Sequence, residues 1–383
     1  MAFPVGWKYR AKLTIDKTKV GADQTDFPVL LTVGNIPTDA LDANGGKPAI
    51  DGGGDLVFTS DLAGATRLAC DVQQFEINDD PASAKAEVWV KVPSVSASVN
   101  TDFYMWWGKV GETQPARNAS FGMEATWDSN FKSVYHLTEG WTTSAGAYKD
   151  ATASAKTGTG STPTGSPTMT GPAGKWGGKC VRCSDAASGS KVWRIACGGS
   201  SPMDYNVRGS TISAWLQTGL TGNGWWTSKG VPGSSKDWEL RGLGNGDFGG
   251  TYKHWWNRTA GDSSVVSSGG VSQNTWTHMV VTVAADGSVI FYINGSVSGT
   301  HGAGTIASVA SGLQLNIGTG STDAETETWR GYVDEVRYSN SVRTANNILT
   351  NYNSTNAPNT FLSYSATTNV TKKKGFTVFL ENL

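Results

Sequence analysis

The sequence predicts an all-β protein made of two antiparallel β-sandwich (jelly-roll) domains in tandem. The chain has 383 residues, more than one hydrophobic core usually holds. It contains 48 glycines and 13 prolines and lacks the long Leu/Ala/Glu/Lys stretches that fill helices. Short segments of alternating apolar and polar residues recur between turn sequences, which is typical of sandwiches.

The first domain is predicted to span residues 1–117. Its opening strand alternates from Trp7 to Asp16, with every second side chain apolar, as a half-buried strand requires. Further strands are expected at residues 27–33, 56–59, 68–77, 87–92 and 102–107. Glycine-rich turns such as residues 44–46 and 51–54 separate them.

The second domain is predicted to span residues 118–358. Strands are expected at residues 131–137, 211–218, 238–242, 276–283, 289–293, 313–317 and 332–338. Asp286-Gly287 between two alternating runs is a strong hairpin signal. The Ala/Ser/Thr/Gly/Pro run at 151–174 is interpreted as a long loop inside this domain rather than as a linker. One short helix is expected at 344–352, with Thr344 as its N-cap.

Residues 359–383 form a C-terminal extension that fits neither domain. Phe376–Leu380 is expected to be a strand, which either closes a sheet of this chain or adds to the edge of a neighbouring chain. We favour the second reading and expect a homo-oligomer or a larger assembly.

The charge balance argues against several partners. Lys and Arg number 31 and Asp and Glu 32, so no overall field attracts nucleic acid. No apolar run reaches the length of a membrane span, so no membrane insertion is expected. No signal-peptide pattern follows Met1, so export by that route is not expected.

The cysteines are interpreted as small buried residues rather than as ligands or redox groups. Cys180 and Cys183 have the spacing of a metal motif, but no second ligand pair accompanies them. A bridge from Cys197 to either of them remains open.

A series of short motifs in the second half resembles the laminin-G-like branch of the concanavalin A-like lectin and glucanase superfamily, over about residues 120–356. The motifs are His136-Leu137-x-Glu139, Tyr148-x-Asp150, Lys175-Trp-Gly-Gly, Thr211-Ile-Ser-Ala-Trp215, Ser228-Lys-Gly230, Trp276-Thr-His278, Asp286-Gly287, Phe291-Tyr-Ile-Asn-Gly295, Ile317-Gly318 and Gly331-Tyr-Val-Asp-Glu-Val-Arg337. The first half contains Trp7-x-Tyr-Arg10, Asp26-Phe-Pro-Val-Leu30 and Asp55-Leu-Val-Phe58. With these motifs, residues 5–115 resemble a domain of unknown function that often precedes laminin-G-like domains in bacterial surface and phage proteins.

Aromatic residues in strand positions suggest a carbohydrate-binding surface, because aromatic rings stack on the apolar faces of sugars. The candidates are Trp225, Trp226, Tyr252, His254, Trp255, Trp256, Asn257 and Arg258. In each Trp pair one ring is expected to join the core and its neighbour to point outward. The alternative is that both rings of each pair are buried beneath long loops.

The resemblance also implies a calcium site. Asp150 and Asp334 match positions where laminin-G-like domains place acidic residues, and Asp323 lies in the loop before the strand of Asp334. The sequence after Asp150 lacks the usual Asn and Gly, however, and the alternative is that these carboxylates are solvated or act as caps.

No catalytic residues are assigned. Asp323, Glu325 and Glu327 alternate as the carboxylates of some glycosidases of this architecture do, but glycine and threonine flank them as in an exposed loop. We therefore expect a non-enzymatic protein.

The combined expectation is a bacteriophage structural protein, a tail or capsid decoration that aids host attachment by binding a cell-surface glycan or another virion protein. Its expected location is the virion. A bacterial adhesin at the cell surface is the alternative, and a glycoside hydrolase is the third.

Overall fold

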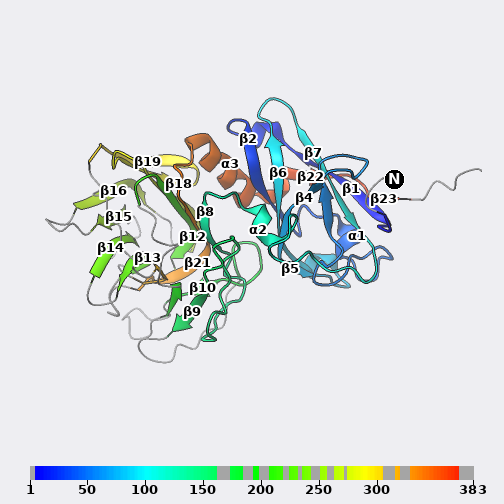
Figure 1. Cartoon of the computed structure of the whole chain (residues 1–383), viewed down its shortest axis with the longest axis horizontal. Helices are drawn as coiled ribbons and strands as arrows, with labels where there is room; N and C mark the ends of the chain where they lie inside the picture. The colour runs from blue at the N-terminus through cyan, green and yellow to red at the C-terminus, as the bar shows by residue number, and fades with distance from the viewer. Residues whose placement is uncertain are drawn as a thin grey trace, which may run out of the picture.

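A computed structural model describes residues 5–161, 173–183, 193–197, 207–218, 224–231, 235–242, 251–256, 263–270, 274–304, 315–319 and 328–370. Between residues 230 and 273 the description of side chains is restricted to Leu240. The described chain is mostly antiparallel β-structure arranged in two sandwiches, so the predicted fold class is confirmed. In Figure 1 the two sandwiches lie side by side, with helix α3 (Ala345–Asn356) near their junction.

The first sandwich packs a six-stranded sheet against a three-stranded sheet. The larger sheet contains β1 (Tyr9–Ile15), β3 (Val57–Thr59), β4 (Arg67–Leu68), β7 (Thr101–Trp107), β22 (Leu362–Tyr364) and β23 (Thr368–Asn369). Its order is β22-β1-β7-β3-β4, and β23 also pairs with β1. The smaller sheet, with the order β2-β6-β5, contains β2 (Gln24–Thr32), β5 (Cys70–Glu76) and β6 (Lys85–Val95).

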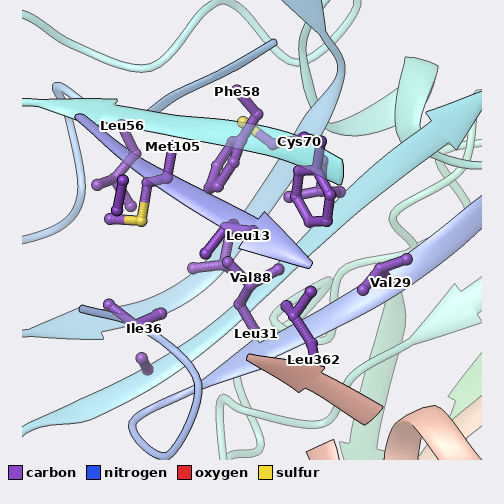
Figure 2. Packing of buried hydrophobic residues seen from close by; sticks show 14 of the residues in the cluster. Leu13, Val29, Leu31, Ile36, Leu56, Phe58, Cys70, Val88, Met105 and Leu362 are labelled. Carbon is purple, nitrogen blue, oxygen red and sulfur yellow. The ribbon is translucent and has the colours of Figure 1, made fainter. Parts of the chain in front are cut away.

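Strand alternation places the core of this sandwich where the sequence predicts it. Ala11, Leu13 and Ile15 of β1 are fully buried, while the residues between them face outward or are half-buried. They pack with side chains of both sheets, including Val88 of β6 and Leu362 of β22 (Figure 2).

The second sandwich pairs two seven-stranded sheets. The first, which we call the inner sheet because it faces the first sandwich, contains β8 (Phe131–Tyr135), β10 (Val181–Arg182), β12 (Ser210–Thr218), β17 (Thr277–Val283), β18 (Val289–Ile293), β19 (Ser296–His301) and β21 (Gly331–Ser339). Its order is β10-β21-β12-β17-β18-β19, with β8 also on β21.

The other sheet, which we call the outer sheet, has the order β16-β15-β14-β13-β20-β11-β9. Its strands are β9 (Gly158–Ser161), β11 (Arg194–Cys197), β13 (Gly224–Val231), β14 (Ser235–Gly242), β15 (Thr251–Trp256), β16 (Ser263–Gly270) and β20 (Leu315–Ile317). A single hydrophobic cluster that includes Ile195, Trp226, Met279 and Tyr338 fills the space between the two sheets.

Helices are few and short in the described part of the chain. They are η1 (Lys17–Lys19), α1 (Thr38–Leu41), η2 (Pro81–Ser83), α2 (Met123–Thr126), α3 and α4 (Pro358–Phe361). The predicted helix is confirmed as α3, because Thr344 accepts a hydrogen bond from the backbone N–H of Asn347. None of these helices is long and apolar enough to cross a membrane.

The described part of the C-terminal extension pairs with a strand of the same chain. After α3 the backbone returns to the first sandwich, where β22 pairs with β1 through Leu13–Tyr364, Thr14–Ser363 and Ile15–Leu362. The first sandwich therefore includes residues beyond 358. The predicted boundaries had placed residues 1–117 in the first domain and residues 359–383 in a separate extension. The predicted strand at Phe376–Leu380 lies outside the described residues.

Local sequence gave an incomplete list of strands. β9 forms within the run that was predicted to be a loop. No strand was predicted over the whole length of β13, β16 or β19. All four cysteines are buried and free, so neither alternative disulfide is present.

Candidate functional site

Much of the outward face of the inner sheet is covered, in part by the first sandwich and in part by α3. Leu30 of β2 and Trp89 of β6 form one apolar cluster with Trp127, Val134 and Ala151. Strand β6 serves two cores at once: Val88 and Val90 face the interior of the first sandwich, and Trp89 between them faces the second. The junction of the two sandwiches is therefore a packed interface.

A group of buried charges lies in the same interface, and we call it the interdomain charge cluster. It comprises Asp71 of β5, Glu87 of β6, His136 directly after β8, and Asp334, Glu335 and Arg337 of β21. All six residues are at most 4% exposed. Buried charges are expensive unless they are paired, so this cluster has to be internally compensated.

His136 joins the two sandwiches. Its Nε2 lies 3.0 Å from Asp71 Oδ2, and its Nδ1 lies 2.6 Å from Glu335 Oε2 and 3.4 Å from Glu87 Oε1. As an imidazolium, the ring donates a hydrogen bond from each nitrogen to a carboxylate. Asp71 and Glu87 belong to the first sandwich and His136 and Glu335 to the second. The contacts of His136 with Asp71 and Glu87 therefore cross the domain boundary, whereas its bond with Glu335 lies within the second sandwich.

A β-bulge helps to place Glu335. The register of β12 against β21 shifts between Ser213 and Trp215, and Glu335 has a left-handed φ of 53°. Non-glycine residues rarely adopt this conformation, so its surroundings must hold it in place. Arg337 Nε donates to Glu335 Oε1 at 2.7 Å, which compensates part of its negative charge.

The aromatic rings around the cluster exclude water and contact the cations. The guanidinium carbon of Arg337 lies 4.3 Å from the ring centroid of Trp89 and 4.8 Å from that of Trp127. Trp127 Nε1 donates to Asp71 Oδ2 at 3.0 Å, and Trp89 Nε1 donates to Glu87 Oε1 at 3.3 Å. Each of these tryptophans thus supplies both apolar cover and a hydrogen bond.

The electrostatics follow from this geometry. Burial disfavours an imidazolium, but the carboxylates of Glu335 and Asp71 outweigh this effect and raise the pKa of His136 well above its usual value. Burial raises the pKa of Glu87. For Glu335, the nearby His136 and Arg337 outweigh burial and lower the pKa. A protonated His136 next to an ionised Glu335 is the arrangement these directions describe.

A metal ion has one candidate ligand group in the described part of the chain. Ligand atoms of Glu87, His136 and Glu335 lie within 4.8 Å of one another. Both nitrogens of His136 already face carboxylates at hydrogen-bonding distance, and Glu335 is also bound by Arg337. The group is complete as an ion-pair network, and we interpret it as a structural connection between the sandwiches.

Asp150 and Asp334, the two described residues expected to bind calcium, both accept hydrogen bonds from backbone N–H groups. Asp150 is fully buried and accepts hydrogen bonds from the backbone N–H groups of Val134, Thr152 and Lys156, so it organises the loop that follows it. Asp334 accepts a hydrogen bond from Lys175 N at 2.8 Å. Asp323 lies outside the described residues, as do Glu325 and Glu327. Both carboxylate oxygens of Asp150 already accept backbone hydrogen bonds, which does not favour their coordination of a calcium ion. Calcium binding stays a prediction.

The aromatic candidates lie on the outer sheet. Trp226 of β13 belongs to the core between the sheets, and Trp225, which is not part of that core cluster, is also buried, at 5% exposed. For this pair the alternative that both rings are buried therefore holds. Tyr252, His254, Trp255 and Trp256 belong to β15, whose backbone alone is described, and Asn257 and Arg258 lie outside the described residues. Their part in carbohydrate binding stays a prediction.

Sequence reasoning did not find the interdomain charge cluster. His136 and Glu335 were named only as parts of motifs of the resembled family, and Asp71 and Glu87 were given no role. A signal was present in β6, where Glu87 and Trp89 occupy alternate positions opposite the apolar ones. A carboxylate and a large ring on a face assumed to be solvated indicate that this face has a partner.

Comparison with known proteins supports the fold of the second sandwich. A family model described as the concanavalin A-like lectin/glucanases superfamily matches residues 200–349. No curated protein matches the chain in sequence. The match covers most of the second sandwich, which is therefore similar to this superfamily in sequence, and the chain as a whole is a tandem β-sandwich protein.

Solved structures resemble the chain at low sequence identity. Domain 4 of AbnA, an extracellular arabinanase from Geobacillus stearothermophilus in complex with arabinotriose, is 16% identical over 58% of this chain and 98% of that one, with a TM-score of 0.43. A SAP-like pentraxin from Limulus polyphemus is 16% identical over 41% and 79%, with a TM-score of 0.32. The binding domain of botulinum neurotoxin serotype D is 12% identical over 58% and 51%, with a TM-score of 0.39.

Proposed function

We propose that this chain is a non-enzymatic recognition protein whose concanavalin A-like sandwich binds a glycan through the outer sheet and its rim. The observation that carries the proposal is the burial of the other face. The inner sheet packs against the first sandwich through Trp89, Trp127 and the interdomain charge cluster. The sheet left for an external ligand is the one that contains β13, β14 and β15.

The strand register selects a position within the outer sheet. Leu240 of β14 is buried in the core between the sheets and pairs with His254 of β15. Because neighbouring positions on a strand belong to opposite faces, position 255 falls on the face away from that core. Trp255 is paired in register with Glu239, and Arg241 with Lys253. An aromatic position among charged ones is the composition expected of a sugar-binding face.

The proposed setting is a surface, on a bacteriophage particle or, alternatively, on a bacterial cell. The packed junction between the sandwiches supports this setting, because it would hold the binding sheet in a fixed direction. Calcium is part of the proposal only at the rim of the outer sheet, since Asp150 is committed to backbone hydrogen bonds.

A glycan-array experiment on the full chain, with and without calcium, tests this function. Trp255→Ala should abolish binding, and Trp255→Phe should restore part of it by returning a ring. Trp141→Ala is the matched control, because Trp141 is an exposed ring of the same domain that lies outside the strands of the outer sheet. Binding that survives Trp255→Ala but not Trp141→Ala would move the site off this sheet, and no glycan binding at all would refute the proposal.

A further inference from the structure

A half-open pocket lies between the outward face of the inner sheet and α3. Its space is about 370 Å³, including its open mouth. Strands β8, β12, β17 and β21 supply its floor, and α3 supplies one wall. The lining residues are Phe131, Thr211, Ser213, His278, Val280, Arg337, Ser339, Arg343, Asn347, Ile348 and Asn351.

Three polar atoms of these lining residues are buried without a hydrogen-bond partner. They are Nδ1 of His278, Nη2 of Arg337 and Nε of Arg343. His278 is 3% exposed and Arg337 is 4% exposed. A buried donor without a partner costs free energy, so the two guanidinium N–H groups indicate a missing acceptor. Nδ1 of His278 joins them as a donor in one of the two neutral tautomers of the ring.

The charge of the pocket favours an anion. Two guanidinium groups line it, and no carboxylate is among the lining residues. Each guanidinium is held by a carboxylate outside this lining: Arg337 Nε donates to Glu335, and Arg343 donates to Asp128 through Nη1 at 2.8 Å and Nη2 at 3.0 Å. These ion pairs therefore fix the position of the remaining N–H groups of each guanidinium.

The remaining lining residues suit a small polar ligand. Ser213 contributes a hydroxyl, and Asn351 contributes an amide from α3. The hydroxyl of Thr211 already donates to Ser341 O, and the amide of Asn347 already donates to Gln24 Oε1. Burial, with the neighbouring charge of Arg337, lowers the pKa of His278 to about 3, so this ring is neutral and can donate from one nitrogen without adding a charge.

We propose that this pocket binds a small oxyanion, a carboxylate, sulfate or phosphate group, between Arg337, Arg343 and α3. Planar guanidinium groups match such oxygens well, and the anion would supply acceptors for the two buried guanidinium nitrogens and for His278 in the tautomer that is protonated at Nδ1. The site lies on the covered side of the sandwich, so it is separate from the glycan-binding sheet proposed above.

The test measures binding of sodium sulfate, phosphate and acetate to the full chain by isothermal titration calorimetry, with sodium chloride at matched ionic strength as the reference. We expect dissociation constants of about 1 mM or lower for at least one oxyanion. Comparison of the three titrations identifies which oxyanion binds. A thermal shift accompanies each titration, because a ligand that binds the native state raises the melting temperature.

Asn351→Asp supplies a carboxylate from within the pocket. It should weaken oxyanion binding by about tenfold or more and raise the melting temperature without added anion. Asn346→Asp makes the same change at an exposed position of the same helix and should leave binding unchanged. Arg343→Lys, which retains the charge but loses the planar fork, should also weaken binding.

Two results would overturn the proposal. One is the absence of measurable heat for all three oxyanions, which would mean that water molecules satisfy the three nitrogens. The other is an equal response of the wild type, Asn351→Asp and Arg343→Lys, which would reduce the effect to a general influence of salt on protein surfaces.

Discussion

At the scale of single residues, His136 is the centre of the interdomain contact. It is buried between carboxylates from β5, β6 and β21, and Trp89 and Trp127 cover its ring at centroid distances of 5.9 and 5.4 Å. Breaking such a pair by removing one partner leaves the other charge buried without compensation, which costs about 3–5 kcal/mol. His136 thus affects stability more than an ordinary surface histidine does.

The raised pKa of His136 makes the stability of the protein depend on pH. The folded state holds the proton above the unfolded pKa of about 6.5, so the contribution is complete below that pH and falls as pH rises toward the folded-state pKa. The slope is at most about 1.4 kcal/mol per pH unit. The buried groups that face His136 are Asp71, Glu87 and Glu335, with Asp334 and Arg337 on β21 beside them.

His136→Gln should lower the free energy of unfolding most at pH 6 and flatten its decline between pH 6.5 and 9, measured by urea unfolding at each pH. His301→Gln removes an imidazole from β19, outside the charge cluster, and should retain the wild-type slope. Parallel slopes for wild type and His136→Gln would show that His136 does not hold the proton.

At the scale of elements, the return of the chain to its first sheet determines how the N-terminal sandwich is completed. Strand β22 adds to β1, and α4 packs Phe361 against Phe27 of β2 at a ring-centroid distance of 6.5 Å. Figure 2 shows Leu362 of β22 pointing into the same core as Leu13 and Val88. The edge of the first sheet and part of its core therefore come from the far end of the sequence.

Leu362→Ala should destabilise the first sandwich by about 2–5 kcal/mol, because it leaves a cavity in a closed core. Ser363→Ala, on the exposed side of the same strand, should change stability by less than about 0.5 kcal/mol. Urea unfolding gives both values. Equal effects of the two substitutions would mean that β22 contributes backbone pairing alone.

At the scale of the whole molecule, the sandwiches form one packed body, because the three-stranded sheet of the first lies against the inner sheet of the second. Leu30 and Trp89 fill this contact from one side and Val134 from the other, and α3 contacts both β2 and β19. Domains that share a large apolar contact unfold together, whereas a weak contact lets each unfold alone.

The wild type should therefore show a single transition in differential scanning calorimetry. Trp89→Ala removes the ring that contacts Trp127, Trp176 and Arg337, and we expect it to cost about 3–5 kcal/mol and to split the transition into two. Trp106→Ala deletes an equally large buried ring within the first sandwich and should lower the melting temperature without splitting it. Two transitions in the wild type would contradict strong coupling of the sandwiches.

The sequence by itself determined the fold class and most strand positions. Alternation along β1 and the hairpin at Asp286-Gly287 are local patterns, and they appear in the structure as β1 and as the β17–β18 connection. The cap at Thr344 is equally local. Such features depend on residues within one or two turns of the chain, so periodicity and turn chemistry are enough to predict them.

Only the tertiary structure decided which outward faces are truly exposed. Alternation separates the two faces of a strand but does not show what covers the face opposite the core. Alternation alone would therefore place Trp89 and Glu87 at the surface. The contact of His136 with Asp71, 65 residues away, arises from sheet packing, and its contact with Glu335, 199 residues away, arises from the pairing of β8 with β21. The pairing of β22 with β1 likewise joins segments about 350 residues apart. Pairings at such separations depend on how whole sheets pack, and no local pattern in one sequence encodes them.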